Sequence, residues 1–205
     1  MKKLILMGLI IPAMCYALAG ISCFDAPRDN MFDPKADNFS GSDLFLFSTA
    51  PVNNGAQGGR AGLDTLCAST RNTSYTELPS DNVHAFISVG LDDEIRDMPV
   101  KYSLPTYLPI KSHTGLVIAD NWADLFDGSI DQTLEDAEIA STGWWSGSLV
   151  DGSSSGATCN GWIANATLNG QVGYIGVKDN DDWINAAINT CDVATNVVLC
   201  ISWND

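Results

Sequence analysis

The sequence predicts an α+β domain in which a cross-linked sheet carries long, ordered loops. The first observation is residues 143–203, which combine tryptophans with clustered glycine and serine turns and contain three cysteines. The second is the apolar run at residues 197–201, whose β-branched content is typical of a buried strand. The third is residues 58–68, where a glycine-rich loop leads into a helical pattern. Together these features favour a disulfide-bonded sheet with aromatic-rich loops.

The composition is that of a globular protein with a strong negative charge. The 205 residues are 45% hydrophobic and 17% charged, so the chain can bury the core of one domain. The formal net charge is −15 at pH 7, and such a surface repels nucleic acids, heparin-like polyanions and anionic lipid headgroups. We therefore expect no binding to nucleic acid or heparin, and a partner that is neutral or offers a basic patch.

The first 22 residues have the pattern of an export signal. Two lysines precede an uncharged apolar run at residues 4–19, and small residues follow it. This run is short for a membrane span and no stop-transfer charges follow it. Two cleavage sites are compatible with the pattern. Ordinary signal peptidase would cut after Ala19, whereas the sequence ending in Cys23 is a loose bacterial lipobox with Gly20 where leucine is usual.

The number of cysteines favours the lipobox. Of the six cysteines, Cys15 lies in the leader, so ordinary cleavage would leave five and one unpaired thiol in an oxidising compartment. Acylation of Cys23 leaves four, which can form two disulfides in any of three connectivities. We therefore predict a lipoprotein signal peptide at residues 1–22, an acylated flexible tether at residues 23–43 and the folded domain at residues 44–205.

The first half of the domain contains a strand followed by a helix. Residues 44–48 are apolar and predict a buried strand. In the helix that starts near Gly58, the side chains of Leu63, Leu66 and Cys67 share one face. The glycines at the start of this helix lack the spacing of a phosphate-binding loop, so they predict only a tight turn.

The middle of the chain predicts a second strand, a rigid loop and a short helix. Residues 83–89 are the strand, and the acidic residues that follow it, with Asp97, predict a solvated helix face. Prolines from Pro99 to Pro109 favour extended loop. A short helix at residues 120–128 would be capped by Asp120 or Asn121, and would end at a glycine.

Catalytic chemistry has little support in the sequence. Residues 152–156 match the G-x-S-x-G pattern, but the pattern needs a strand before it, a helix after it and a histidine partner, and Ser154 lies in a loop of serine and glycine. The two histidines, His84 and His113, have no second ligand at metal-binding spacing. A secreted hydrolase that uses the Ser154 loop is therefore a remote alternative, and we expect no enzymatic activity.

Calcium binding is another alternative. Asp179, Asp181 and Asp182 place three carboxylates in one turn, and Ca²⁺ prefers such hard oxygen ligands. The spacing is not that of an EF-hand loop. The triplet Trp203-Asn204-Asp205 matches one found in C-type lectins, although its position relative to the cysteines differs. A structural calcium ion and calcium-dependent carbohydrate binding remain alternatives, and otherwise we expect no cofactor.

The chain also resembles a known family. The motifs that carry the resemblance are, in chain order, Gly62-x-Asp64-x-x-Cys67, residues 84–88, Trp122-x-x-Leu125-Phe126-x-Gly128, Trp145-x-Gly147-Ser148 followed by Cys159-x-x-Trp162, and Cys191 with residues 198–201. Over residues 44–203 this ordered set resembles endostatin, the C-terminal domain of certain collagens. The resemblance implies a C-type-lectin-like fold with a mixed, mainly antiparallel sheet, two helices, long ordered loops and two nested disulfides. It implies the pairs Cys67–Cys200 and Cys159–Cys191.

With an acylated leader, the chain is most similar to the leptospiral endostatin-like lipoproteins. That similarity implies a lipid-anchored adhesin on the bacterial outer membrane, exposed at the cell surface, which binds laminin, fibronectin or the complement regulator factor H. Its roles would be adhesion to extracellular matrix, complement evasion and virulence. The histidine cluster that binds zinc in mammalian endostatin has no counterpart in residues 24–43. The heparin-binding arginines of endostatin have no counterpart in the predicted domain.

The predicted mechanism is recognition by rigid loops. Disulfides and tryptophan packing fix the loops, so little entropy is lost on association. The contact loops would be residues 143–158 and 179–183, with Trp144, Trp145 and Trp183 as the aromatic anchors. Membrane contact would occur through the lipid anchor only.

Overall fold

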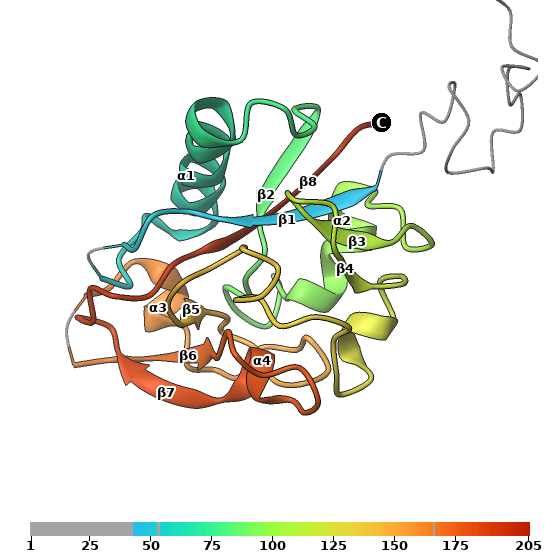
Figure 1. Ribbon diagram of the computed structural model, residues 1–205. Helices are drawn as coiled ribbons and strands as arrows, with labels where there is room; N and C mark the ends of the chain where they lie inside the picture. Colours follow the sequence, from blue (N-terminus) through green and yellow to red (C-terminus); the bar gives the residue numbers. More distant parts are fainter. Residues whose placement is uncertain (1–42, 53, 166) are drawn as a thin grey trace, which may run out of the picture. The chain divides into compact units, whose positions relative to one another are not determined.

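The computed structural model describes residues 43–52, 54–165 and 167–205 (Figure 1). The predicted signal peptide, the Cys23 anchor and the tether up to residue 42 lie outside the described residues. The first described residue already belongs to the domain, because the Asp43 carboxylate accepts a hydrogen bond of 2.7 Å from Lys111 Nζ.

The larger sheet has five strands in the order β2-β8-β1-β3-β4. Their bounds are Leu44–Ser48 for β1, Asn82–Ala85 for β2, Ile110–Ser112 for β3, Val117–Ala119 for β4 and Leu199–Trp203 for β8. β1 and β3 are parallel, and the other three pairs are antiparallel. β8 follows every other strand in sequence and nevertheless lies inside the sheet, between β2 and β1 (Figure 1).

The smaller sheet has three antiparallel strands in the order β5-β6-β7. They are Trp144–Trp145, Asn169–Gly173 and Ala187–Thr190. An isolated bridge between Trp144 and Val197 connects this sheet to the segment that leads into β8. The aromatic stretch of the sequence is therefore split between this sheet and the loops around it.

The helix predicted after the glycine loop is present as α1, Gly59–Ser74, which has sixteen residues. Leu63 and Cys67 are buried and Leu66 is half-buried, which confirms the predicted apolar face. Gly62 has no room for a side chain, since a Cβ there would overlap the carbonyl of Gln57. The entry to the helix is thus closed by backbone packing.

The remaining helical segments are short. They are η1 Ile95–Asp97, α2 Met98–Tyr102, η2 Asp124–Phe126, α3 Cys159–Trp162 and α4 Asp182–Asn185. The predicted helix at residues 120–128 is one 3₁₀ turn, and Asn121 Oδ1 accepts hydrogen bonds from the amides of Ala123 and Asp124, at 3.0 and 3.3 Å. The structure is therefore a mixed α+β domain with a mixed sheet.

Two hydrophobic clusters cover the two faces of the larger sheet. Side chains alternate along a strand, so Leu199, Ile201 and Trp203 of β8 point into one cluster and Cys200 points into the other. All five residues of β8 are buried. This strand is the centre of the core.

Both predicted disulfides are present. Cys67–Cys200 joins α1 to β8, and Cys159–Cys191 joins the start of α3 to the residue that follows β7. None of the described residues is a free cysteine. The first bond ties an early helix to the central strand, and the second closes the loops of the smaller sheet.

Candidate functional site

A rigid loop at residues 146–156 is the best-defined candidate contact surface. Glu94, beneath the loop, is only 2% exposed. It accepts hydrogen bonds from the Ser154 amide at 2.8 Å and from Arg96 Nε at 2.6 Å, while the Arg96 amide donates to the Gly152 carbonyl at 3.2 Å. The middle of the loop is therefore fixed to the turn that precedes η1. We call residues 146–156 the pinned loop.

The first part of the pinned loop is held by buried serines. Ser88 Oγ lies 2.7 Å from Ser148 Oγ and accepts a hydrogen bond from the Ile95 amide at 3.0 Å. Gly147 has a φ of 62°, and a Cβ there would overlap the carbonyl of Ser88. Only glycine fits this close approach, because other residues avoid positive φ and carry a side chain.

Two side chains project from the tip of the pinned loop. Leu149 is 41% exposed, and the side chain of Asp151 is 57% exposed. Hydrogen bonds from the hydroxyl and the amide of Ser153, with the nearby Arg96 charge, outweigh partial desolvation and hold the pKa of Asp151 below its usual range. The loop therefore presents an apolar group and an ordered carboxylate in fixed positions.

The structure corrects the predicted aromatic anchors. Trp144, Trp145 and Trp183 have an exposed fraction of 0%. Trp144 Nε1 donates to the Trp183 carbonyl at 2.8 Å, and the two rings stack with centroids 6.0 Å apart. These side chains support the loops from the core and are not a contact surface, because packing against both clusters stabilises them more than exposure would.

The acidic turn at residues 179–182 provides no calcium coordination shell. Among the described residues, no three His, Cys, Asp or Glu side chains converge on a position for a metal ion. The side chain of Asp179 is 87% exposed and pairs with Lys178 at 3.9 Å, while Asp181 and Asp182 lie at the start of α4. The geometry therefore does not support the predicted calcium ligands.

Ser154 also has no histidine partner among the hydrogen bonds of the described residues. Its amide donates to Glu94, and its hydroxyl accepts from the Gly156 amide at 3.3 Å. His84 Nδ1 is instead 3.3 Å from an Asp64 oxygen, and His113 packs edge-on against Tyr75. The elements of a Ser–His dyad are not brought together here.

A second ionic group covers the outer edge of β2. Arg60 of α1 donates to the carbonyls of Ala85 and Ile87, both at 2.6 Å, and pairs with Asp93 at 2.9 Å. The Asp64 carboxylate accepts a hydrogen bond of 2.9 Å from the Ala85 amide. Side chains of α1 thus satisfy backbone groups that an edge strand leaves unpaired. We assign this group a structural role.

The Asp64 carboxylate makes stability depend on pH. Burial opposes its ionisation, but hydrogen bonds from His84 and the Ala85 amide, with the Arg60 charge, hold its pKa below the ordinary value of 3.8. The contribution of Asp64 to the free energy of unfolding is complete above the pKa that this group has in the unfolded chain. It is lost as the pH falls through the pKa that the group has in the folded protein. We expect the free energy of unfolding to fall more steeply below about pH 4 in the wild type than in Asp64→Asn.

Urea unfolding at a series of pH values between about 2 and 7 measures this difference. Asp92→Asn, which changes an exposed carboxylate in the same region, serves as the control and should keep the wild-type slope. Parallel curves for the wild type and Asp64→Asn would contradict the assignment.

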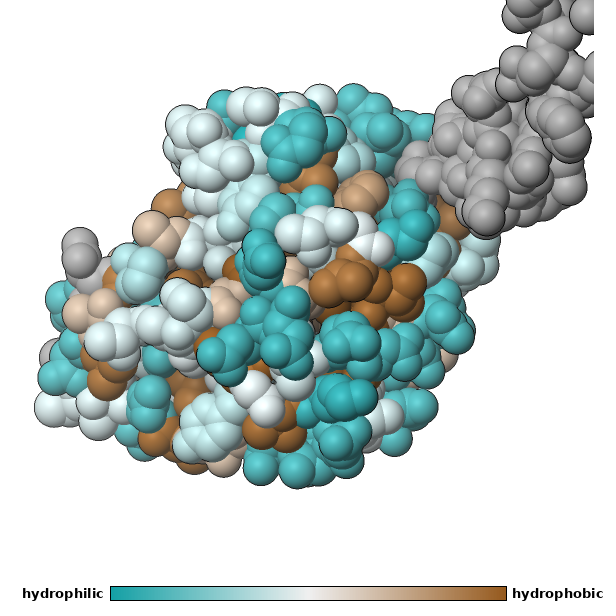
Figure 2. Space-filling model, viewed as in Figure 1, coloured by the Kyte–Doolittle hydropathy of each residue, from teal (hydrophilic) through white to brown (hydrophobic). Residues whose placement is uncertain are grey.

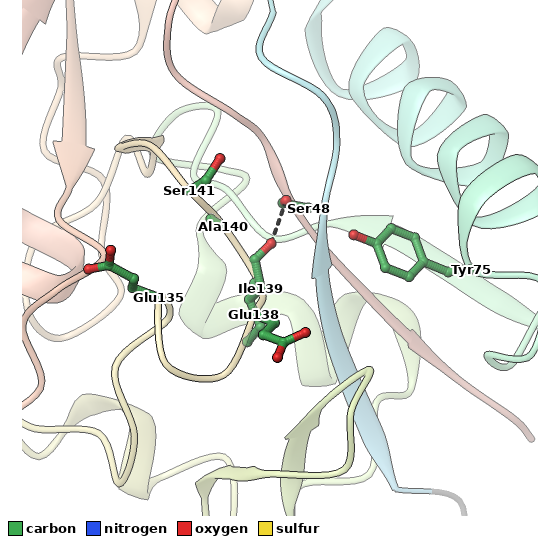
Figure 3. Close-up of a pocket in the computed structure, with 7 residues that line it drawn as sticks. All are labelled: Ser48, Tyr75, Glu135, Glu138, Ile139, Ala140 and Ser141. Carbon is green, nitrogen blue, oxygen red and sulfur yellow. Dashed lines mark hydrogen bonds between the residues drawn. The ribbon is translucent and has the colours of Figure 1, made fainter.

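A shallow pocket of about 420 Å³ lies between the end of α1 and residues 135–141 (Figure 3). Its lining residues are Ser48, Tyr75, Glu135, Glu138, Ile139, Ala140 and Ser141. Ser48 Oγ donates to the Ile139 carbonyl at 2.5 Å, which joins β1 to this segment. Glu135 and Glu138 are both exposed, so the hollow is part of the acidic surface and is not an enclosed site.

The residues that hold the pinned loop were not predicted from sequence. Asp93 and Glu94 belong to the acidic run that was expected to be a solvated helix face, yet Glu94 is buried and Asp93 pairs with Arg60. The prediction was wrong because each side chain also has a distant partner: Arg60 lies 33 residues from Asp93, and Ser154 lies 60 residues from Glu94. No local pattern records such a distant partner.

No protein-family model matches the chain, and no curated protein matches it. In the part of the chain that the structure describes, no helix combines the length and the apolar character needed to cross a bilayer.

Proposed function

We propose that the chain is a lipid-anchored bacterial surface adhesin of the endostatin-like, C-type-lectin-like type, which binds a host protein through the pinned loop. The host protein would be an extracellular-matrix component such as laminin or fibronectin, or the complement regulator factor H. The observation that carries the proposal is the buried Glu94 carboxylate beneath the loop. Burial of a carboxylate is costly unless it is paired and hydrogen-bonded, as Glu94 is to Arg96 and to the Ser154 amide, and these bonds hold the loop.

The fold is consistent with this assignment. Both disulfides follow the pairing that the endostatin resemblance implies, and one of them, Cys159–Cys191, begins three residues after the end of the pinned loop. A preorganised loop loses little conformational entropy when it binds, so a few exposed groups can give useful affinity. Leu149 would supply the apolar contact and Asp151 the charged one.

The surface charge defines the partner further. The face shown in Figure 2 is largely hydrophilic, and its apolar residues lie in small, separate groups. A chain with a net charge of −15 favours a partner with a basic patch. We propose no contact with nucleic acid or heparin, no enzymatic activity, and membrane attachment at the outer membrane through Cys23 only.

Surface plasmon resonance with the mature, non-reduced protein tests the proposal. Laminin, fibronectin and factor H are immobilised, and binding is measured over a range of salt concentrations. We expect saturable binding to at least one of them, weakened by salt, and about tenfold weaker for Leu149→Ala because truncation removes a central apolar contact.

The matched control is Leu116→Ala, which removes a leucine of similar exposure, 44% against 41%, from the loop between β3 and β4. It should bind like the wild type. The absence of binding to all three proteins, or equal losses for the two variants, would refute the proposal. Loss of binding in EDTA would favour the calcium-dependent lectin instead.

A further inference from the structure

The outer edge of β7 is a second surface that can bind a partner. In the smaller sheet β6 lies between β5 and β7. The Gln171 amide of β6 donates to the Ala157 carbonyl at 2.7 Å, and the Gln171 carbonyl accepts from the amides of Ser146 and Gly147, at 3.0 and 3.2 Å. The backbone amide and carbonyl of Gln171 therefore point away from β7.

This direction fixes the orientation of the paired residue. Gln171 is opposite Ile188 in the antiparallel register, and Asn169 is opposite Thr190. In an antiparallel pair, the backbone amide and carbonyl groups of two opposite residues either all point toward the other strand or all point away from it. The amide and carbonyl of Ile188 and the amide of Thr190 thus face the open side of β7, and within the described residues no backbone group pairs with them.

The edge is held in place and lacks two of the usual forms of protection. β7 contains no charged residue and no proline, which are the features that normally prevent strand addition at an edge. The Ile188 side chain is 57% exposed. Gln171 Nε2 donates to the Ala187 carbonyl at 2.9 Å, and the disulfide at Cys191 fixes the end of the strand.

The charges around β7 select the occupant. Asp181 and Asp182 precede the strand and Asp192 follows it, and there is no lysine or arginine between Asp179 and Asp205. A second copy of this chain would bring these carboxylates together, so its pairing here is disfavoured. We propose that the β7 edge binds an extended, basic segment of a partner protein by strand addition.

This surface is made of different residues from the pinned loop, so it does not depend on the function proposed above. The bound segment would place alternate side chains on Ile188 and form main-chain hydrogen bonds with the open groups of Ile188 and Thr190. Basic residues at its ends would lie near the carboxylates that flank the strand. Affinity would come from the main chain, and selectivity from charge.

The test uses the mature, non-reduced protein and a synthetic peptide, Lys-Lys-Val-Thr-Val-Thr-Lys-Lys, with glutamate in place of every lysine as the control peptide. We expect the cationic peptide to bind in calorimetry and to slow hydrogen exchange at the amides of Ile188 and Thr190. The anionic peptide should do neither. Ile188→Pro removes one open amide, and should weaken binding of the cationic peptide about tenfold or more.

Ile188→Val keeps the amide and a β-branched side chain, so it should bind the peptide like the wild type. If Ile188→Pro does not fold, the double substitution Asp182→Asn and Asp192→Asn provides the test instead, with an expected loss of about fivefold and a weaker dependence on salt. Equal binding of both peptides, or protection confined to other amides, would overturn the proposal. Dimerisation with protection of Ile188 would also overturn it, because the edge would then bind a second copy.

Discussion

Replacing Cys67 and Cys200 together by alanine should lower the free energy of unfolding by about 4 to 5 kcal/mol. The two cysteines are 133 residues apart in sequence, so their bond removes a large amount of conformational freedom from the unfolded chain. Both side chains are fully buried, and their shortening also leaves unfilled space in the core. Guanidinium unfolding of the non-reduced variant, followed by tryptophan fluorescence, measures the loss.

The double substitution of Cys159 and Cys191 by alanine is the comparison. These residues are separated by 32 positions, and the same loop-entropy argument gives a loss of about 4 kcal/mol. The Cys67–Cys200 variant should therefore be the less stable of the two. The reverse order would show that the longer crosslink contributes less to stability than its position in the core suggests.

Replacing Glu94 by alanine should cost about 3 kcal/mol and release the pinned loop. The substitution removes the acceptor for the Ser154 amide and for Arg96, and it leaves a cavity under the loop. The amide of Ser154 should exchange faster with solvent, since nothing else holds it. Hydrogen-exchange mass spectrometry resolved to this segment, together with thermal unfolding, measures both effects.

Two variants show whether the charge or the position of Glu94 is responsible. Glu94→Gln keeps an acceptor for Ser154, so it should restore part of the protection in the loop but not the pairing with Arg96. Asp97→Ala removes an exposed carboxylate three residues away, and should change stability by less than about 0.5 kcal/mol. Unchanged exchange of Ser154 in Glu94→Ala would contradict the role assigned to this carboxylate.

Local patterns were sufficient for some elements and insufficient for others. The apolar run at residues 44–48 is a strand in the structure, and the face formed by Leu63 and Cys67 is buried as predicted. In contrast, β6 has the sequence Asn-Gly-Gln-Val-Gly, which has low strand propensity. β6 exists because it pairs with strands on both sides, and this information is not local.

The tryptophans show a related limit. The sequence analysis predicted Trp144 and Trp183 as aromatic anchors, and both side chains are buried. Residue type alone does not distinguish an exposed anchor from a buried support. The stack of these two rings forms between residues 39 positions apart. Likewise, the burial of Glu94 depends on the loop that passes over it.

The position of β8 has a consequence for the biogenesis of the protein. The strand that is synthesised after all the others completes the middle of the larger sheet, where it pairs with β1 and β2 at once. The sheet therefore cannot be completed before β8 has left the ribosome. If the chain is exported as proposed above, this order would keep the larger sheet incomplete, and the chain unfolded, until β8 has crossed the membrane.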